Sequence, residues 1–349
     1  MRIGDHPLKA NPALGGYGLH RLIMPVFIPN TEGYFAEAIE VLRLCLESLR
    51  LTRKPATAVT IAANGCCQAA RAVLQGEMEA GWIDQLTLHA RNRGKVDAIM
   101  GAARGCFEPI VTFADCDVLF RRGWDSAIEN LFAVFPECGF VSPFCVPGSE
   151  MGFTSAAILA GMAGRTIRFE AIANPSDVAA FARSIGHPER FQGVERLGQF
   201  VLRREGVSAG IGGGHFVCSL RRPVIQAAPA GPAMQAICGD SETNWLDLPP
   251  DRLGYWRLMT DRACVQHLGN RLEPWMAQEL AALRRAPPPA DTQPMALRPM
   301  RRHWTALVPY PIRVRLADFL GRRLRERCRR RAGSLAATPR ASPASGARG

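Results

Sequence analysis

The chain has 349 residues, of which 47% are hydrophobic and 21% are charged, with a net charge of +12. These proportions are typical of a globular protein with one large or two modest domains. No apolar run approaches the roughly 20 residues of a transmembrane helix, and residues 1–10 do not resemble a signal peptide. The 11 cysteines are odd in number and form no CxxC pair, which favours a reducing cytoplasm over a disulfide framework or a zinc site.

The positive charge is concentrated at the C-terminal end. From Arg298 onwards the chain has 14 arginines, with Asp318 and Glu326 as the only acids, so the preceding residues carry no net charge. Interleaved aromatic residues and a folded basic reader are both missing from this tail, and nucleic acid is therefore not expected as a partner.

Predicted strands and helices alternate through the first 140 residues. Apolar, β-branched runs predict strands, and apolar positions at helical spacing predict helices. The expected strands are 20–29, 57–63, 86–89 and 110–120, and the expected helices are 33–53, 68–80, 96–104 and 124–134. This alternation predicts right-handed βαβ units on a mostly parallel sheet flanked by helices. No GxGxxG follows the first strand, so a dinucleotide site is not supported.

The second half of the chain is less regular. Helices are expected at 154–163 and 176–185, and the glycine-rich stretch 210–220 predicts a loop that leads into a strand. A short helix is expected at 223–228, and short strands are expected within 253–268.

Two carboxylates, Asp115 and Asp117, stand close together after an apolar run. Side chains at i and i+2 of an extended chain point the same way, and like charges beside a buried strand are costly unless a cation accompanies them. A hard divalent cation such as Mg²⁺ or Mn²⁺ suits carboxylate oxygens, and ligands of open α/β sheets bind beyond the carboxyl ends of the strands. Solvated acids at a strand end are the alternative, because a lone DxD is a weak signal.

Seven stretches, in order, resemble the GT-A glycosyltransferases, most closely the family-2-like members that build bacterial cell-surface polysaccharides. They are MPVFIP with the following helix that ends in LCLESL, then IAANGC, NRGKVDAIMGAARG, VTFADCDVLFRRGW, GGGHFVCSLRRPVI, GDSETNW and VQHLGN. The resemblance covers about residues 20–270 and implies a GT-A, Rossmann-like α/β fold. It implies a catalytic domain over 1–275, with a nucleotide-sugar half at 18–145 and an acceptor half at 146–275.

The resemblance also implies a metal site. Asp117 would ligate Mn²⁺ or Mg²⁺ directly, Asp115 would reach the metal through water or the donor ribose, and His267 would complete the coordination. The metal would neutralise the nucleoside diphosphate as it leaves. A half-buried histidine at a strand end is the alternative interpretation of His267.

Five further residues are implied to hold the nucleotide-sugar donor, a UDP- or GDP-sugar. Lys95 and Arg93 would lie over its phosphates or sugar, and Pro25, Phe27 and Asn64 would line the nucleotide site. A solvated basic turn is the alternative for Lys95 and Arg93, although a lysine at a helix N-terminus opposes the helix dipole unless an anion is present. Family members usually have an acid near the position of Asn64, so this sequence does not determine whether the base is uracil or guanine.

Asp240 and Glu242, in GDSETNW, match the acidic motif that supplies the catalytic base of inverting members. One carboxylate would take the proton of the acceptor hydroxyl as it attacks the anomeric carbon; Asp240 aligns best, with Glu242 close behind. Two surface acids in a loop are the alternative. Trp245 and Trp256 are candidates for stacking on sugars or for the core, and glycines 212–214 resemble an acceptor-side loop or form an ordinary turn.

The C-terminal part is expected to contain a Pro-rich linker at 276–299, a basic amphipathic helix at 300–331 and a disordered tail at 332–349. The apolar face of the helix comprises Trp304, Val308, Tyr310, Ile312, Leu316, Phe319, Leu320 and Leu324, and arginines surround it at 313, 315, 322, 323, 325 and 327. Such a helix can lie on an anionic membrane, at about 1 kcal/mol per basic residue, or it can dock on the catalytic domain.

The leading hypothesis is a metal-dependent, inverting glycosyltransferase, cytoplasmic or peripheral on the inner face of the membrane. It would move a sugar from a nucleotide-sugar to a hydroxyl of a saccharide or lipid-linked acceptor. A sugar-phosphate nucleotidyltransferase is one alternative, although no glycine-rich basic loop follows the first strand. A non-catalytic nucleotide-sugar-binding protein on the same fold is the other.

Overall fold

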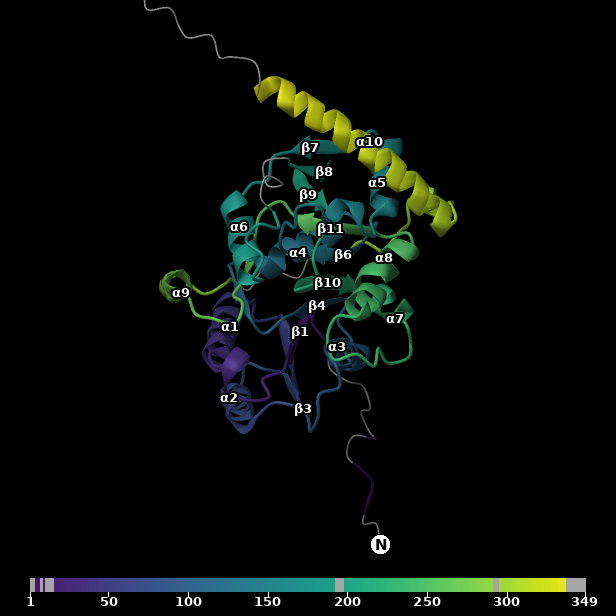
Figure 1. Ribbon diagram of the computed structural model, residues 1–349. Coiled ribbons are helices and arrows are strands. Elements are labelled where there is room, and N and C mark those ends of the chain that lie inside the picture. Colours follow the sequence, from purple (N-terminus) through teal and green to yellow (C-terminus); the bar gives the residue numbers. More distant parts are fainter. Residues whose placement is uncertain (1–3, 7–8, 10–15, 192–197, 291–294, 337–349) are drawn as a thin grey trace, which may run out of the picture.

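The computed structural model describes residues 4–6, 9, 16–191, 198–290 and 295–336 (Figure 1). The helices are α1 (Ala38–Thr52), α2 (Gln68–Glu79), α3 (Lys95–Arg104), α4 (Trp124–Val134), α5 (Ser155–Ala163), α6 (Pro175–Ser184), α7 (Arg222–Ala227), α8 (Leu248–Arg252), α9 (Pro274–Arg285) and α10 (Tyr310–Ala336). The strands are β1 (His20–Val26), β2 (Ala58–Asn64), β3 (Gln85–His89), β4 (Ile110–Ala114), β5 (Val118–Phe120), β6 (Cys138–Ser142), β7 (Arg168–Glu170), β8 (Gln199–Arg204), β9 (Val207–Ile211), β10 (Val217–Arg221), β11 (Trp256–Thr260) and β12 (Val265–His267).

Most strands join one central sheet, which within the described ranges has ten strands in the order β3-β2-β1-β4-β10-β6-β11-β9-β8-β7. The strands β3, β2, β1 and β4 are parallel, as the alternation of elements predicts. β10 lies between β4 and β6 and runs antiparallel to both. β11 is parallel to β6, and β9, β8 and β7 continue the sheet in antiparallel pairs. The predicted α/β class, with helices flanking a large sheet, is confirmed.

The strand β1 shows why the first half reads as continuous apolar runs. Leu22 and Met24 belong to the main hydrophobic core, which includes residues of α1 and α4, whereas Ile23 between them packs with residues of α3 and α7. Figure 1 shows α1 and α2 on one side of this part of the sheet and α3 and α7 on the other. A strand covered on both faces needs apolar residues at every position, not at alternate ones.

The stretch 110–120 forms two strands instead of the single strand predicted. β4 ends at Ala114, the chain bends through 115–117, and β5 then pairs with β12 in a separate two-stranded sheet. The Asp115 amide donates to the Phe216 carbonyl over 2.8 Å, and the Leu268 amide donates to the Asp117 carbonyl over 2.7 Å. The prediction was wrong because pairing with β12 draws the chain away from the main sheet, and this pairing brings His267 beside the two acids.

Most of the other predicted elements lie near their expected ranges, but β6, β7, β8, β9 and α8 were not predicted. Two further differences concern helices. The helix expected at 33–53 divides into a short 3₁₀ turn, Gly33–Phe35, and α1. Residues 274–285 form α9, a helix that the sequence analysis did not anticipate, in the first part of the segment assigned to a linker. It packs against α1, where Arg284 pairs with Glu47 at 2.6 Å.

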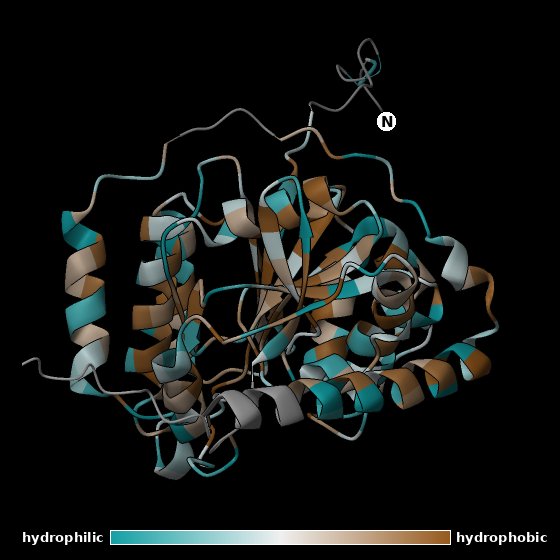
Figure 2. Ribbon diagram, turned by 90° about the horizontal axis from the view of Figure 1, so that it is seen from above, coloured by the Kyte–Doolittle hydropathy of each residue, from teal (hydrophilic) through white to brown (hydrophobic). Residues whose placement is uncertain are grey.

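The C-terminal helix α10 packs on α5 and lies along one side of the molecule (Figure 2). It runs to Ala336, past the predicted end at 331, and the remainder of the expected disordered tail, 337–349, lies outside the described residues. None of the helices within the described ranges is long and apolar enough to cross a membrane. Of the two candidate stacking tryptophans, Trp256 is buried against Phe135 in the core, and Trp245 is half-buried against the α3–α7 side of the sheet.

Candidate active site

Two cavities meet at the carboxyl end of β4. The first, of about 450 Å³, is called here the strand-end cavity, and it is lined by residues at or just after the ends of β1, β2 and β4, among them Phe27, Asn64 and Asp117. The second, of about 480 Å³, is called the glycine-loop cavity and is lined by Gly213, Gly214, His215, Asp247, Arg257 and His267 among others. Lys95 and Asp115 line both cavities. A molecule that fills one cavity therefore shares this pair of residues with a molecule in the other.

Lys95, the first residue of α3, is the cation at this junction. Its Nζ lies 2.6 Å from Asp115 Oδ1 and 3.7 Å from Glu242 Oε1. Burial by itself lowers the pKa of a lysine, but the neighbouring carboxylates Asp115, Glu242 and Asp117 outweigh it and raise the pKa of Lys95. The ammonium group is thus held charged in a largely enclosed place, where an anionic ligand would gain from it.

Asp117 and His267 face one another near Asp115. Asp117 Oδ2 lies 3.4 Å from His267 Nε2, and the other ring nitrogen of His267 is hydrogen-bonded to the Ser184 hydroxyl at 2.9 Å. The His267 ring also packs edge-on against Phe181 and Phe216. Burial raises the pKa of the Asp117 carboxyl, His267 opposes this shift, and Asp115 adds to it. The Asp117 carboxylate therefore lacks full compensation from the protein's own cations.

These side chains fit a divalent cation in chemical type. A carboxylate and an imidazole whose second nitrogen is fixed by a hydrogen bond are a donor set that Mn²⁺ accepts, and a cation would relieve the cost of burying Asp117 beside Asp115. Among the residues whose placement is described, no three His, Cys, Asp or Glu side chains converge on a common point. A metal held by Asp117 and His267 would therefore depend on ligand or water oxygens for the rest of its coordination, as Mg²⁺ often does.

Asn64 holds the loop that precedes α3, and Arg93 is part of that loop. Asn64 Oδ1 accepts from the Arg93 amide at 2.8 Å, and its Nδ2 donates to Asn92 Oδ1 at 2.9 Å and to the Gly94 carbonyl at 3.2 Å. The amide of Asn64 thus fixes the loop that places Lys95. The Arg93 side chain is exposed and is not among the residues lining either cavity. Gly94 has φ +90°, and a Cβ there would lie 2.0 Å from the Gln235 carbonyl oxygen, so the loop requires glycine.

The two acids of GDSETNW differ in their surroundings. Glu242 is buried, accepts a hydrogen bond from Ser241 Oγ at 3.0 Å, and faces Lys95. Burial raises the pKa of Glu242. The Lys95 charge, a backbone hydrogen bond and the bond from Ser241 outweigh burial, so the net pKa of Glu242 is below the ordinary value. Asp240 is exposed, with a positive φ of 66°. The structure thus brings Glu242, and not the preferred Asp240, beside Lys95, although Glu242 itself lines neither cavity.

An ion-pair network that was not predicted from the sequence forms part of the wall of the glycine-loop cavity. Asp247 accepts from Arg257 at 2.8 Å and is hydrogen-bonded to His215 Nδ1 at 3.2 Å. Burial raises the pKa of Asp247, but Arg257 and His215 outweigh it and lower the net pKa, so Asp247 is ionised. His215 is oriented by this carboxylate and is partly exposed in the cavity. Its place directly after three glycines was the signal in the sequence.

Two of the three glycines, Gly212 and Gly213, are required by packing within the protein. Gly212 and Gly213 have φ values of +119° and +143°. A Cβ at Gly212 would lie 2.3 Å from Ser149 Oγ, and one at Gly213 would lie 2.7 Å from the Phe140 ring. The atoms that approach these glycines closely belong to Ser149 and Phe140 of the same chain, and this packing holds the loop and His215 at the cavity.

The fold and the site together define an α/β protein in which Lys95, Asp115 and Asp117 gather near the carboxyl ends of the parallel strands, where open α/β sheets bind their ligands. No protein-family model and no curated protein matches the chain significantly. Among the many solved structures that resemble the chain are two weak matches. One is the mannosyltransferase PcManGT from Pyrobaculum calidifontis in complex with GDP-Man and Mn²⁺, with 14% identity, a TM-score of 0.43, and 93% of this chain and 77% of that one covered. The other is residues 1–349 of S. aureus TarS, with 12% identity, a TM-score of 0.40, and 76% and 63% covered.

Proposed function

We propose that this chain is a metal-dependent, inverting glycosyltransferase of the GT-A type, which moves a sugar from a UDP- or GDP-sugar to a hydroxyl of a saccharide or lipid-linked acceptor. The observation that carries the proposal is the meeting of two cavities at Lys95 and Asp115. A transferase needs its donor and its acceptor in contact at one point, with a charge sink for the leaving group on the donor side.

The strand-end cavity is the proposed donor site. Phe27 and Pro25 offer apolar surface to a nucleotide base, and Lys95 stands where the diphosphate would meet Asp115 and Asp117. At ~4 Å and an effective dielectric near 20, each pair of unit charges contributes about 4 kcal/mol. Lys95 can therefore stabilise a large part of the charge that develops on a departing nucleoside diphosphate.

Asp117 and His267 would hold the divalent cation, with Asp115 beside them. When bound, Mn²⁺ or Mg²⁺ would add a second positive charge against the diphosphate. The protein itself positions both groups. The Leu268 amide holds the Asp117 backbone by donating to its carbonyl, and the Ser184 hydroxyl holds the His267 ring.

The glycine-loop cavity is the proposed acceptor site. Glu242 is ionised and lies next to Lys95, so it is the proposed acceptor of the hydroxyl proton, in preference to the exposed Asp240. His215 is a second group that could receive this proton, because an imidazole oriented by a buried carboxylate is a good base.

The cysteines support the proposed cytoplasmic location. Most of the cysteines in the described part of the chain are buried, among them Cys45, Cys138 and Cys218. A reducing compartment suits such a set of thiols.

The experiment that tests the function is a donor screen. Thermal shift with UDP- and GDP-sugars in the presence of Mn²⁺ or Mg²⁺ identifies a donor, and the product released in the presence of acceptors is then analysed. Release of nucleoside diphosphate that is lost in Asp117→Ala supports the proposal, provided that the variant keeps its melting temperature. Release of pyrophosphate would identify a nucleotidyltransferase instead, and donor binding without any turnover would identify a binding protein.

A further inference from the structure

The predicted apolar face of the C-terminal helix divides into two faces in the structure. Leu320 and Leu324 are partly buried and pack on the main core. Trp304, Leu307, Ile312, Leu316 and Phe319 remain 43–86% exposed. The last five residues, together with the exposed arginines described below, are called here the outer face. One helix thus has an anchored side and a second apolar side that nothing in the described chain covers.

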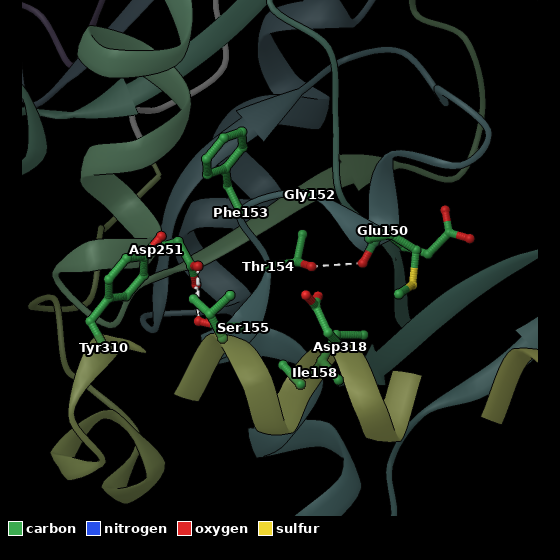
Figure 3. Close-up of a pocket in the computed structure, with 12 residues that line it drawn as sticks. Glu150, Gly152, Phe153, Thr154, Ser155, Ile158, Asp251, Tyr310 and Asp318 are labelled. Carbon is green, nitrogen blue, oxygen red and sulfur yellow. Dashed lines mark hydrogen bonds between the residues drawn. The ribbon is translucent and has the colours of Figure 1, made fainter. Parts of the chain in front are cut away.

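The inner side is fixed to the body by buried polar contacts. Arg313 is almost fully buried; it donates to Ser155 Oγ at 3.0 Å and also to the Asp251 carbonyl. Asp251 in turn accepts from Ser155, and these two residues border a cavity of about 200 Å³ that Tyr310 and Asp318 of α10 also line (Figure 3). Further along, Arg325 pairs with the buried Glu150. The helix is therefore held in a defined orientation, and its outer face is a fixed surface.

The outer face combines the apolar residues with positive charge. Arg315, Arg322, Arg323 and Arg327 are exposed on the same side of α10, with Glu326 as the one acid among them. Arg323 lies 4.2 Å from the centre of the Phe319 ring. Figure 2 shows that the hydrophobic residues gather in the first part of the helix. An apolar patch continued by a basic patch along one face is the pattern of helices that lie in a membrane interface.

We infer that the outer face of α10 and the preceding turn Trp304–Leu307 is a docking surface for an anionic lipid bilayer. The apolar side chains would enter the headgroup region and the arginines would pair with lipid phosphates. A second copy of this chain fits the surface less well. In a two-fold dimer the same face would meet itself, so four arginines of one copy would face four of the other.

The position of this surface relative to the cavities adds a second observation, which rests on the proposed function. A further cavity of about 380 Å³ is lined by Val146, Ser149, Arg190, Phe191 and Arg325 among others. The first four of these residues also line the glycine-loop cavity. The two cavities therefore adjoin, with Arg325 of α10 in the outer one and Arg190 in both, and these arginines suit an acceptor that carries phosphate and is anchored in the same bilayer.

The test is co-sedimentation of the full chain with vesicles of phosphatidylcholine, with and without phosphatidylglycerol. Binding is expected to the anionic vesicles, and to fall as salt is raised. Leu316→Asp and Phe319→Asp are expected to abolish binding. Each of Arg315→Gln, Arg322→Gln and Arg323→Gln is expected to weaken it about fivefold, since a basic residue near such a surface contributes about 1 kcal/mol. Leu88→Asp, at an equally exposed leucine on the edge strand β3, is the matched control and should bind as the unchanged protein does.

Equal binding to neutral and anionic vesicles, or full binding by Leu316→Asp, would overturn the inference. A concentration-dependent dimer that Phe319→Asp dissociates would also overturn it, because the occupant would then be a second copy. Binding of nucleotide-sugar, followed by thermal shift in the same variants, is expected to be unchanged. If the protein turns over a donor but does not bind vesicles, the docking inference fails and the proposed function stands. If it binds vesicles but turns over no donor, the proposed function fails and the docking inference stands.

Discussion

Lys95 and Asp115 form an ion pair of 2.6 Å, and the same two residues border both cavities of the candidate site. The lysine comes from the start of α3 and the aspartate from the end of β4, so the parallel arrangement of β1, β2 and β4 brings them together. The loop before Lys95 is itself fixed by Asn64 at the end of β2. The topology of the backbone thus determines where the Lys95 ammonium and the Asp115 carboxylate lie.

The first prediction concerns this lysine. Lys95→Ala should lower the rate of nucleoside diphosphate release about 10²- to 10³-fold, because it removes a fixed cation from the place where negative charge develops. Lys95→Arg should recover part of the rate, since it keeps the charge but not the compact shape. Lys9→Ala, at an exposed lysine, is the control. A turnover of Lys95→Ala equal to that of the unchanged protein would remove Lys95 from the mechanism.

The second prediction concerns metal binding. Asp117→Asn and His267→Gln should each abolish measurable Mn²⁺ binding, because each removes one of the two facing donors. Ser184→Ala should weaken Mn²⁺ binding about 10- to 100-fold, because the hydroxyl holds the His267 ring in place. Isothermal titration with Mn²⁺ measures all three, with Asp261→Asn, an exposed acid, as the control. Unchanged affinity in His267→Gln would show that the histidine is only a structural neighbour of Asp117.

The third prediction separates the candidate bases. Glu242→Gln should reduce sugar transfer about 10²- to 10⁴-fold, the usual contribution of a general base, with donor affinity less affected. Asp240→Asn should behave like the unchanged protein. Since the pKa of Glu242 is held below its ordinary value of 4.5, the acid limb of the transfer rate should lie below pH 4.5. Loss of transfer in His215→Gln, with Glu242→Gln active, would assign the proton to the imidazole instead.

The fourth prediction concerns stability and pH. The buried Glu129 lies between His20 Nδ1, at 3.2 Å, and the Lys54 ammonium. Burial raises the pKa of Glu129, but these two partners outweigh it and lower the net pKa. A lowered pKa stabilises the fold above the unfolded value near 4.5, and that stabilisation is lost as the pH falls through the folded pKa.

Glu129→Gln should therefore lower the free energy of unfolding by about 3 kcal/mol at pH 7, the usual cost of breaking a buried pair. Urea titrations at decreasing pH should show the gap between the two proteins closing in acid. Glu40→Gln, at an exposed position of α1, should leave the free energy of unfolding nearly unchanged. A gap that stays constant down to the acid end of the titration would mean that the charge of Glu129 does not stabilise the fold.

The sequence predicted the parts of the molecule in which local pattern and burial agree. The alternation of apolar runs with helical spacing located the first half of the sheet, because those strands are buried on both faces. It could not locate the bend at 115–117, since that depends on pairing with β12 more than a hundred residues away. The role of Asn64 was also hidden, because its partners at 92–94 are set by the loop and not by spacing.

The sequence indicated the charged residues that lie at the two cavities, but it did not indicate the ion pair of Asp247 and Arg257. Lys95, Asp115, Asp117 and His267 stood in recognisable stretches, and all four lie at the cavities. The Asp247–Arg257 pair had no such signal, since Asp247 ends the π-helical turn Thr243–Asp247 and Arg257 lies ten residues later in β11, so the path of the chain through α8 brings them together.

The direction of β10 decides which of its neighbours can meet a ligand. In the parallel strands the chain reaches the binding edge as each strand ends, so the residues that follow the strand lie there. β10 runs the other way, and the segment that precedes it, with His215, occupies that edge. The helix that follows it, α7, is carried to the opposite edge, where the Arg222 amide bonds the Pro109 carbonyl. In proteins with this topology, substitutions that change substrate preference should therefore occur in the segment before β10. Substitutions in the turn after β10 should affect only packing at the opposite edge of the sheet.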